Sequence, residues 1–124
     1  FIAKAYRWRK MFGGGMRQSG IVAAAGLYAL EHNIERLAED HARAKRLAAA
    51  VDAMPGFSVD IAGVQTNMVY VTTEAPATEV VAGLAEHGVD LFDLESNSIR
   101  VAIHLHITDE DVDKTLAAFA ALAA

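Results

Sequence analysis

Glycine and apolar residues divide the first part of the chain into two predicted helices. Residues 1–12 have helical spacing, and three consecutive glycines at 13–15 then make continuation of the helix costly. A second helix is predicted over residues 16–32. Because this segment is apolar nearly all round, we expect it to be buried.

A third helix is predicted over residues 34–54. Asn33 is a suitable N-cap for it, and Pro55-Gly56 ends the periodic pattern. The residues expected to face the core share one helical stripe: Ile34, Leu37, Ala38, His41, Ala44, Ala48 and Val51. The charged residues expected mostly outside this stripe are Arg36, Glu39, Asp40, Arg43 and Arg46.

The second half of the chain alternates between strand and helix patterns. Four short apolar or β-branched segments are predicted as strands: 57–61, 67–73, 89–92 and 98–105. Pro76 suits the first turn of an intervening helix, and Gly88 suits its C-terminal left-handed position. Thr108 and Asp111 resemble a capping box that starts a final amphipathic helix. The order ββαββα predicts an α+β module, a small mixed sheet with helices on one face.

Composition places the chain among globular proteins with one real core. It has 124 residues, 53% of them hydrophobic, and no cysteine, which excludes disulfides and agrees with a reducing, cytoplasmic compartment. No apolar run approaches the roughly 18 residues that span a bilayer, so we expect no membrane partner. The net charge of −5 argues against non-specific binding of nucleic acid.

Cations gather at the start of this acidic chain, where the first twenty residues contain no carboxylate. Lys10 and Arg17 bracket the glycine run, whose backbone N–H groups can approach an anion closely beside a helix N-terminus. The run matches neither a P-loop nor GxGxxG. Two interpretations stay open on composition: a phosphate-type anion pocket, or a flexible turn with solvated cations.

Arg100 is the second candidate anion-binding residue. It is the only cation between Arg46 and Lys114 and lies within an apolar strand pattern. An arginine that projects from a central strand needs a counter-anion, since an unpaired buried charge is costly. Asp93 or Glu95 could supply that anion, and a ligand carboxylate could equally do so. The residues expected on the same strand face as Arg100 are Ala102, His104 and His106, with Ile99, Val101, Ile103 and Leu105 on the other.

His104 and His106 form an H-x-H pair that could share a metal ion. No third ligand is evident in the sequence, so no metal site is predicted. No Ser-His-Asp or Cys-His arrangement stands out either.

One stretch of the sequence is highly specific, RWRKMFGGGMRQSGIVAAAGLYAL at 7–30. Together with TNMVYV at 66–71, GVDLF at 88–92 and IRVAIHLHIT at 99–108, it resembles the low-specificity L-threonine aldolases. These are pyridoxal-phosphate (PLP) enzymes of the aspartate-aminotransferase fold type, fold type I. The resemblance implies an α/β fold-type-I enzyme in which 1–33 end the large PLP-binding domain, 34–54 form a linking helix and 55–124 form the small C-terminal α+β domain.

The resemblance also implies roles for three cations. Arg17 and Lys10 are assigned to the cofactor phosphate, supplied across a subunit interface to a neighbouring identical subunit in a homodimer or homotetramer. Lys10 could instead position the catalytic water. Arg100 matches the arginine that holds the carboxylate of the amino-acid substrate.

The implied reaction is cleavage of L-threonine or L-allo-threonine to glycine and acetaldehyde. This chain contains neither the lysine that forms the Schiff base nor the aspartate that pairs with the pyridine nitrogen, so we expect no catalytic residue here and an inactive fragment. Phe12 and His106 depart from the family pattern, which leaves the substrate preference open.

Two alternative functions remain. One is a non-catalytic α+β amino-acid-binding module, and the other is a different fold-type-I β-eliminating lyase. Because residue 1 opens in a helical pattern without a cap, we expect a piece of a longer protein, with removal of a tag as the alternative.

Overall fold

The computed structural model describes residues 1–123 and divides the chain into two units, Phe1–Glu35 and Arg36–Ala124. The first unit contains α1 (Ile2–Met11) and α2 (Gly20–His32). No residue of either helix is buried, so the expected burial of the second helix is wrong for this chain taken by itself. None of the helices among the described residues is long and apolar enough to cross a membrane.

The segments on either side of α2 differ from the prediction. The helix begins at Gly20 rather than at residue 16, because residues 17–19 form a turn that places Ser19 at the N-cap. Asn33 ends α2 rather than capping the next helix, since its backbone N–H donates to the Ala29 carbonyl at 2.9 Å. The third helix, α3 (Leu37–Asp52), therefore starts later than expected.

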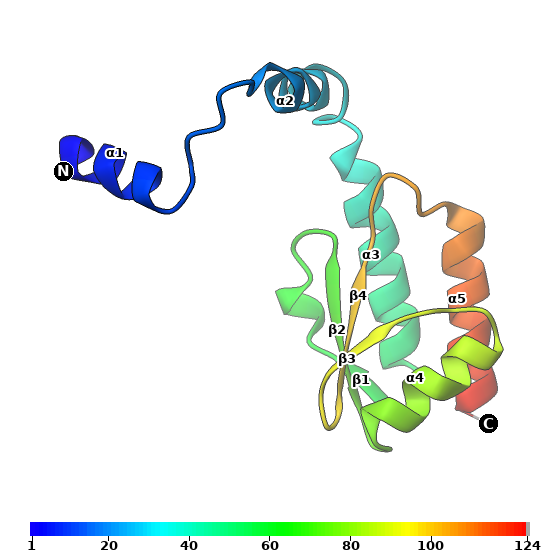
Figure 1. The fold of residues 1–124 in the computed structure, drawn as a ribbon. Helices are drawn as coiled ribbons and strands as arrows, with labels where there is room; N and C mark the ends of the chain where they lie inside the picture. Colours follow the sequence, from blue (N-terminus) through cyan, green and yellow to red (C-terminus); the bar gives the residue numbers. More distant parts are fainter. Residues whose placement is uncertain (124) are drawn as a thin grey trace. The chain divides into compact units, whose positions relative to one another are not determined.

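A four-stranded sheet forms the centre of the second unit. Its strands are β1 (Phe57–Val59), β2 (Met68–Thr73), β3 (Phe92–Glu95) and β4 (Ser98–Ala102), in the order β1-β2-β4-β3. Every neighbouring pair is antiparallel, so the expected mixed sheet is an antiparallel one. The order brings the two longest strands, β2 and β4, together in the middle (Figure 1).

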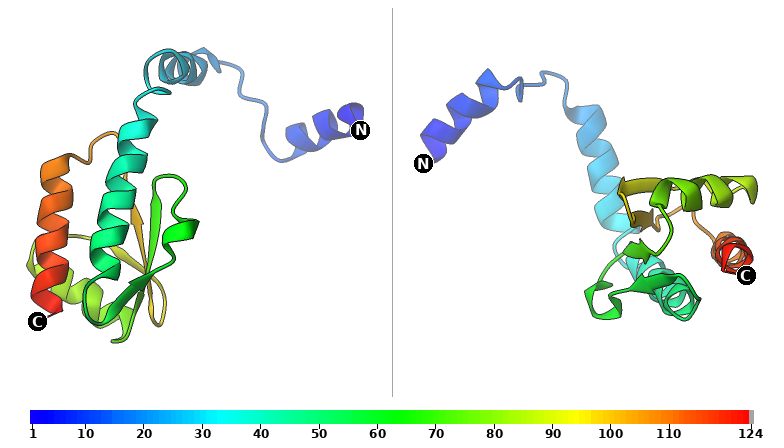
Figure 2. Two further views of the ribbon diagram at one scale, coloured as in Figure 1. Left: turned by 180° about the vertical axis from the view of Figure 1, so that it is seen from behind. Right: turned by 90° about the horizontal axis from the view of Figure 1, so that it is seen from below.

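Three helices cover one face of this sheet. They are α3, α4 (Ala77–Glu86) and α5 (Asp109–Leu122), and α3 and α5 lie side by side (Figures 1 and 2). Phe119 of α5 is fully buried and packs edge-on against Phe57 of β1, with ring centroids 5.1 Å apart. The strand residues that face these helices are buried: Val59, Val69, Val71, Ile99 and Val101. The predicted element order ββαββα is confirmed, with a short 3-10 helix (Ile61–Gly63) inserted after β1.

The third strand is displaced from its predicted position at 89–92. Gly88 has φ +72° and the Val89 N–H donates to the Leu84 carbonyl at 3.0 Å, so Val89 completes the C-terminal cap of α4. Val89 is buried against the helical layer and not within the sheet. Pairing begins only at Phe92, because the backbone around 88–91 is occupied in leaving the helix.

Two other strands, β1 and β4, also end earlier than predicted. β1 stops at Val59, where the chain enters the 3-10 helix, and β4 stops at Ala102. Ile103 is still buried, whereas Leu105 is half exposed. The expectation that Leu105 shares one strand face with Ile99, Val101 and Ile103 is therefore wrong.

Asp40 is the main departure from the stripe predicted for α3. It was expected outside the stripe but is only 2% exposed, whereas Ile34, Leu37 and Ala38, which were expected within it, are exposed. Arg36 makes two hydrogen bonds to the Asp40 carboxylate, at 3.0 and 2.6 Å, which compensates for the burial of the charge. The buried residues of α3 are Asp40, Ala44, Leu47, Ala48 and Val51.

Ion pairs join α3 to the start of α5. Arg43 donates two hydrogen bonds to the Asp109 carboxylate, at 3.1 and 3.2 Å, and Arg46 pairs with Asp113. The hydrogen bond from Arg43 lowers the pKa of Asp109 below its usual range. These ion pairs link α3 and α5 at the solvent-exposed side of the helical layer.

Candidate functional site

The cationic segment at the start of the chain brings Lys10 close to the glycine run. A Cβ atom at Gly15 would lie 2.8 Å from the Lys10 Nζ atom, so the glycine leaves the space that the ammonium group occupies. Gly13 has φ +81°, which turns the chain sharply after α1. Glycine is thus needed at position 13 for the turn, whereas at position 15 it leaves room for the flexible end of Lys10.

The glycine N–H groups do not form the anion cradle expected from the sequence. Gly13 donates to the Lys10 carbonyl at 3.2 Å, Gly14 to the Arg9 carbonyl at 2.8 Å and Gly15 to the Gly13 carbonyl at 2.8 Å. All three N–H groups are therefore satisfied inside the turn. The interpretation in which these groups bind an anion is wrong.

The segment that follows, residues 16–19, is better suited to an anion. Within residues 1–123, none of its backbone N–H groups donates to another backbone carbonyl. Arg17 is exposed in this segment, directly before the N-terminus of α2, whose partial positive charge favours anions. Arg17 and the turn at 16–19 thus have N–H donors available for an anion, whereas the N–H groups of the glycines are already used.

Arg100 lies on the open face of the sheet. It is exposed, whereas its neighbours Ile99 and Val101 are buried on the helix-covered face, as the alternation predicts. Among the described residues no carboxylate lies within 4.0 Å of its guanidinium group. The two internal partners suggested by the sequence, Asp93 and Glu95, therefore do not pair with it.

Register explains why Asp93 cannot reach Arg100. Asp93 lies opposite Ile99, so the two share the other face of the sheet. The structure thus leaves the guanidinium group of Arg100 available to a ligand on the open face.

Two aromatic residues next to Arg100 were not identified from the sequence. Tyr70 of β2 and Phe92 of β3 lie directly opposite Arg100, one on each side of β4. Both are exposed, at 53% and 75%. Only the strand register reveals this row, because the three residues are far apart in the sequence.

The histidine pair lies beyond the end of β4. The rings of His104 and His106 are 5.8 Å apart and nearly perpendicular, and His104 Nδ1 accepts a hydrogen bond from the His106 backbone N–H at 3.3 Å. In the part of the chain that the structure describes, no group of three or more histidine, aspartate or glutamate side chains could hold a metal ion.

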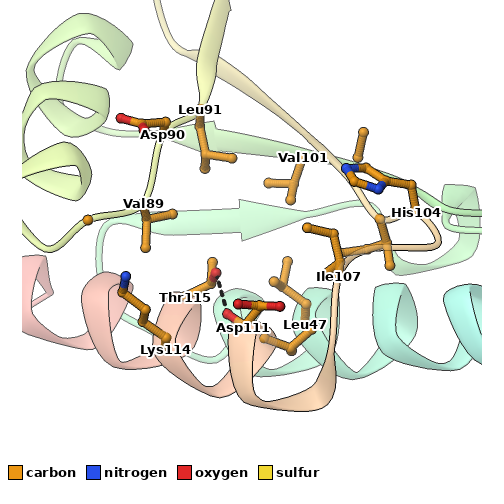
Figure 3. Close-up of a pocket in the computed structure, with 14 residues that line it drawn as sticks. Leu47, Val89, Asp90, Leu91, Val101, His104, Ile107, Asp111, Lys114 and Thr115 are labelled. Atoms are coloured by element: carbon orange, nitrogen blue, oxygen red, sulfur yellow. Dashed lines mark hydrogen bonds between the residues drawn. The ribbon is translucent and has the colours of Figure 1, made fainter.

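A cavity of about 260 Å³ lies on the helix side of the sheet, between the loop after α4 and the start of α5. Figure 3 shows apolar side chains such as Val101 and Leu47 around it, with Asp90 and Lys114 at its margin. Asp111 is engaged by the capping box, and Thr115 donates to the Asp111 carbonyl at 2.7 Å. The cavity and Arg100 are therefore on opposite faces of β4.

The sequence-predicted site residues thus belong to two separate units. Lys10 and Arg17 lie in Phe1–Glu35, and Arg100 lies in Arg36–Ala124. Each unit, described by itself, has an exposed cation: Arg17 in the first and Arg100 in the second.

The sequence of the chain is similar to that of two low-specificity L-threonine aldolases. Over 123 residues the chain is 42% identical to low-specificity L-threonine aldolase 1 of Arabidopsis thaliana, covering 96% of this chain and 34% of that protein. Over 119 residues it is 39% identical to the low specificity L-threonine aldolase of Escherichia coli (strain K12), covering 94% of this chain and 34% of that protein. The chain therefore spans about one third of the length of these relatives.

The fold has a counterpart among solved structures. A structure of a C-DES mutant with glycine covalently linked to its PLP cofactor aligns with a TM-score of 0.65 and 20% identity, covering 82% of this chain and 28% of that one. This similarity shows the fold, which is that of fold-type-I PLP enzymes. The family model for beta-eliminating lyases matches residues 1–74, and the chain belongs to this family.

Proposed function

We propose that this chain is the C-terminal part of a PLP-dependent aldehyde-lyase that cleaves L-threonine and L-allo-threonine to glycine and acetaldehyde. The observation that carries the proposal is identity of 42% and 39%, over nearly all of this chain, to proteins named low-specificity L-threonine aldolases. The free guanidinium group of Arg100 supports it, because an amino-acid substrate brings a carboxylate.

The domain assignment belongs to the same proposal. Residues 1–33 would end the large domain, 34–54 link the domains and 55–124 form the small domain. The exposed apolar residues of α2, such as Ile21 and Leu30, support this, since they would pack against the rest of a large domain. The described units divide at a similar place, with α3 grouped with the C-terminal sheet.

The residues of this chain fit a bound PLP group at its phosphate. Arg17 offers a planar fork for phosphate oxygens, and the turn at 16–19 offers unpaired N–H groups. Lys10 lies against Gly15, where it adds a mobile positive charge. When bound, PLP supplies an electron sink for the negative charge left by Cα–Cβ cleavage.

Arg100 would hold and orient the substrate. A bidentate pair with the carboxylate fixes the amino acid at one end, so that the bond to be broken is placed the same way in each turnover. The fragment contains no lysine at the position that binds the cofactor covalently, and we predict that it is inactive by itself.

A second candidate is β-elimination, which the family match to beta-eliminating lyases favours. The products distinguish the two reactions. Aldol cleavage of serine gives glycine and formaldehyde, whereas elimination gives pyruvate and ammonia. The full-length protein should therefore be assayed with threonine, serine and phenylserine, and the products identified by mass spectrometry. Glycine from all three substrates supports the proposal, and pyruvate from serine contradicts it.

The proposed neighbouring subunit can be tested by mixing variants. If Arg17 acts across the interface while Arg100 acts within its own subunit, a hybrid of Arg17→Ala and Arg100→Ala subunits contains one intact site. Co-expression of the two inactive variants should then restore up to about one quarter of the wild-type activity. If both residues act in the same subunit, no hybrid site is intact and activity stays absent.

A further inference from the structure

Three residues form a row across the open face of the sheet. Arg100 stands on the central strand β4, with Tyr70 opposite on β2 and Phe92 opposite on β3. Residues directly opposite each other in an antiparallel pair point to the same face, with Cβ atoms about 5 Å apart. Arg100 therefore shares the open face of the sheet with an aromatic side chain on each neighbouring strand.

Nothing else in the described part of the chain holds this arginine. It makes no hydrogen bond and no ion pair there, and neither ring stacks on it, since the cation–π contact in these residues joins Arg9 to Tyr6. Arg100 is also the only cation on this sheet. A long side chain with no partner has many rotamers, and ordering it on binding costs free energy.

The flanking rings limit those rotamers. Tyr70 and Phe92 are bulky, and each stands on the strand beside Arg100, so a sideways swing of the arginine in either direction meets a ring. The neighbouring row offers a contrast, because Thr72 and Ser98 are small. The row on the other side pairs Ala102 with Met68, and neither residue is aromatic. On the open face of β2 and β4, an aromatic side chain is therefore placed only beside Arg100.

We propose that Tyr70 and Phe92 are positioning residues for Arg100, which keep its guanidinium group upright for the substrate carboxylate. The inference rests on the proposed function, which assigns the carboxylate to Arg100. Tyr70 and Phe92 act by restricting the rotamers of Arg100, so the aromatic ring of Tyr70 is required and its hydroxyl group is not. They lower the free energy needed to order the Arg100 side chain when the carboxylate binds, and they leave the bond-breaking step unchanged.

The test uses the full-length enzyme and glycine, the amino-acid product, as the probe. Tyr70→Ala and Phe92→Ala should each weaken glycine binding by about 2- to 10-fold in isothermal titration calorimetry. With threonine, KM should rise by a similar factor while kcat stays near that of the wild type. Thr72→Ala is the matched control on the same strand and face, and Tyr70→Phe should bind glycine like the wild type.

Two further measurements separate positioning from a general loss of structure. Methylamine has the amine of glycine but no carboxylate, so its affinity should not change in Tyr70→Ala. In the Arg100→Ala background, Tyr70→Ala should produce no additional loss of glycine affinity, because the residue it positions is already absent.

The outcomes distinguish this inference from the function on which it rests. If Arg100→Ala weakens glycine binding but Tyr70→Ala and Phe92→Ala behave like Thr72→Ala, only the positioning role is overturned. An equal loss of methylamine affinity, or the same loss in the Arg100→Ala background, also overturns it. If Arg100→Ala itself binds glycine like the wild type, the carboxylate assignment fails and the positioning role fails with it.

Discussion

Replacement of Arg100 by alanine in the full-length enzyme should weaken substrate binding without weakening the fold. The side chain is exposed and forms no hydrogen bond or ion pair within residues 1–123, so its removal breaks no contact described in the free chain. Its loss should therefore appear almost entirely in the complex with the substrate. We expect KM for threonine to rise while the melting temperature changes little.

The size of the effect follows from the contacts that would be lost. Hydrogen bonds to charged groups contribute about 1.5–3 kcal/mol. At about 1.4 kcal/mol per factor of ten, this predicts a rise in KM of about 10- to 150-fold. Arg100→Lys keeps the positive charge but loses the planar fork, so its KM should lie between those of the wild type and Arg100→Ala.

Steady-state kinetics over a wide range of threonine concentrations measures both parameters. Thermal unfolding of the same preparations serves as the control for folding. A KM unchanged within twofold in Arg100→Ala, in a protein that melts like the wild type, would refute the reasoning. A large fall in melting temperature would show instead that Arg100 has a structural partner.

Three predictions concern the stability of the C-terminal unit. Phe119→Ala removes a fully buried ring packed on Phe57 and should lower the free energy of unfolding by about 3–5 kcal/mol, measured by urea titration. Thr108→Ala breaks the capping box with Asp111 and should cost about 1 kcal/mol in the same titration, whereas Thr108→Ser should cost less. The backbone hydrogen bond from Thr108 lowers the pKa of Asp111, so the stability it contributes is present at neutral pH and is lost as the pH falls below about 4. Asp111→Asn should show a smaller fall in melting temperature between pH 6 and pH 3 than the wild type, and an identical fall would contradict this assignment.

Local signals predicted most of the fold. The capping box at Thr108 and the left-handed glycine at 88 depend on a few neighbouring residues, and the structure confirms both. The alternation around Arg100 likewise gave its face correctly, because one buried side fixes the register of a strand. These features need no knowledge of distant parts of the chain.

The errors arise where a backbone group has two available partners. Asn33 could have capped the next helix, but its backbone stays in the helical region (φ −112°, ψ −7°) as the C-cap of α2. Val89 is as apolar as a strand residue, yet it completes the cap of α4. The N–H groups of the glycines at 13–15 could have bound an anion, but they donate to carbonyl oxygens of α1 and of Gly13 instead. Composition does not decide between such partners.

The candidate site was predicted only in part, for a different reason. Arg100 and Arg17 could be selected as isolated cations, and the family resemblance gave them roles. Tyr70 and Phe92 could not be selected, because they lie beside Arg100 only through the pairing of β4 with two other strands. A row of residues that crosses three strands becomes visible once the register is known.

The stoichiometry of products from L-threonine tests the proposed function most directly. The full-length protein, supplied with PLP, should release glycine and acetaldehyde in equal amounts, and each should account for one molecule of threonine consumed. Glycine can be measured by amino-acid analysis and acetaldehyde by coupled reduction with an alcohol dehydrogenase. Release of 2-oxobutanoate and ammonia in place of glycine would contradict the account, because it would show elimination rather than aldol cleavage.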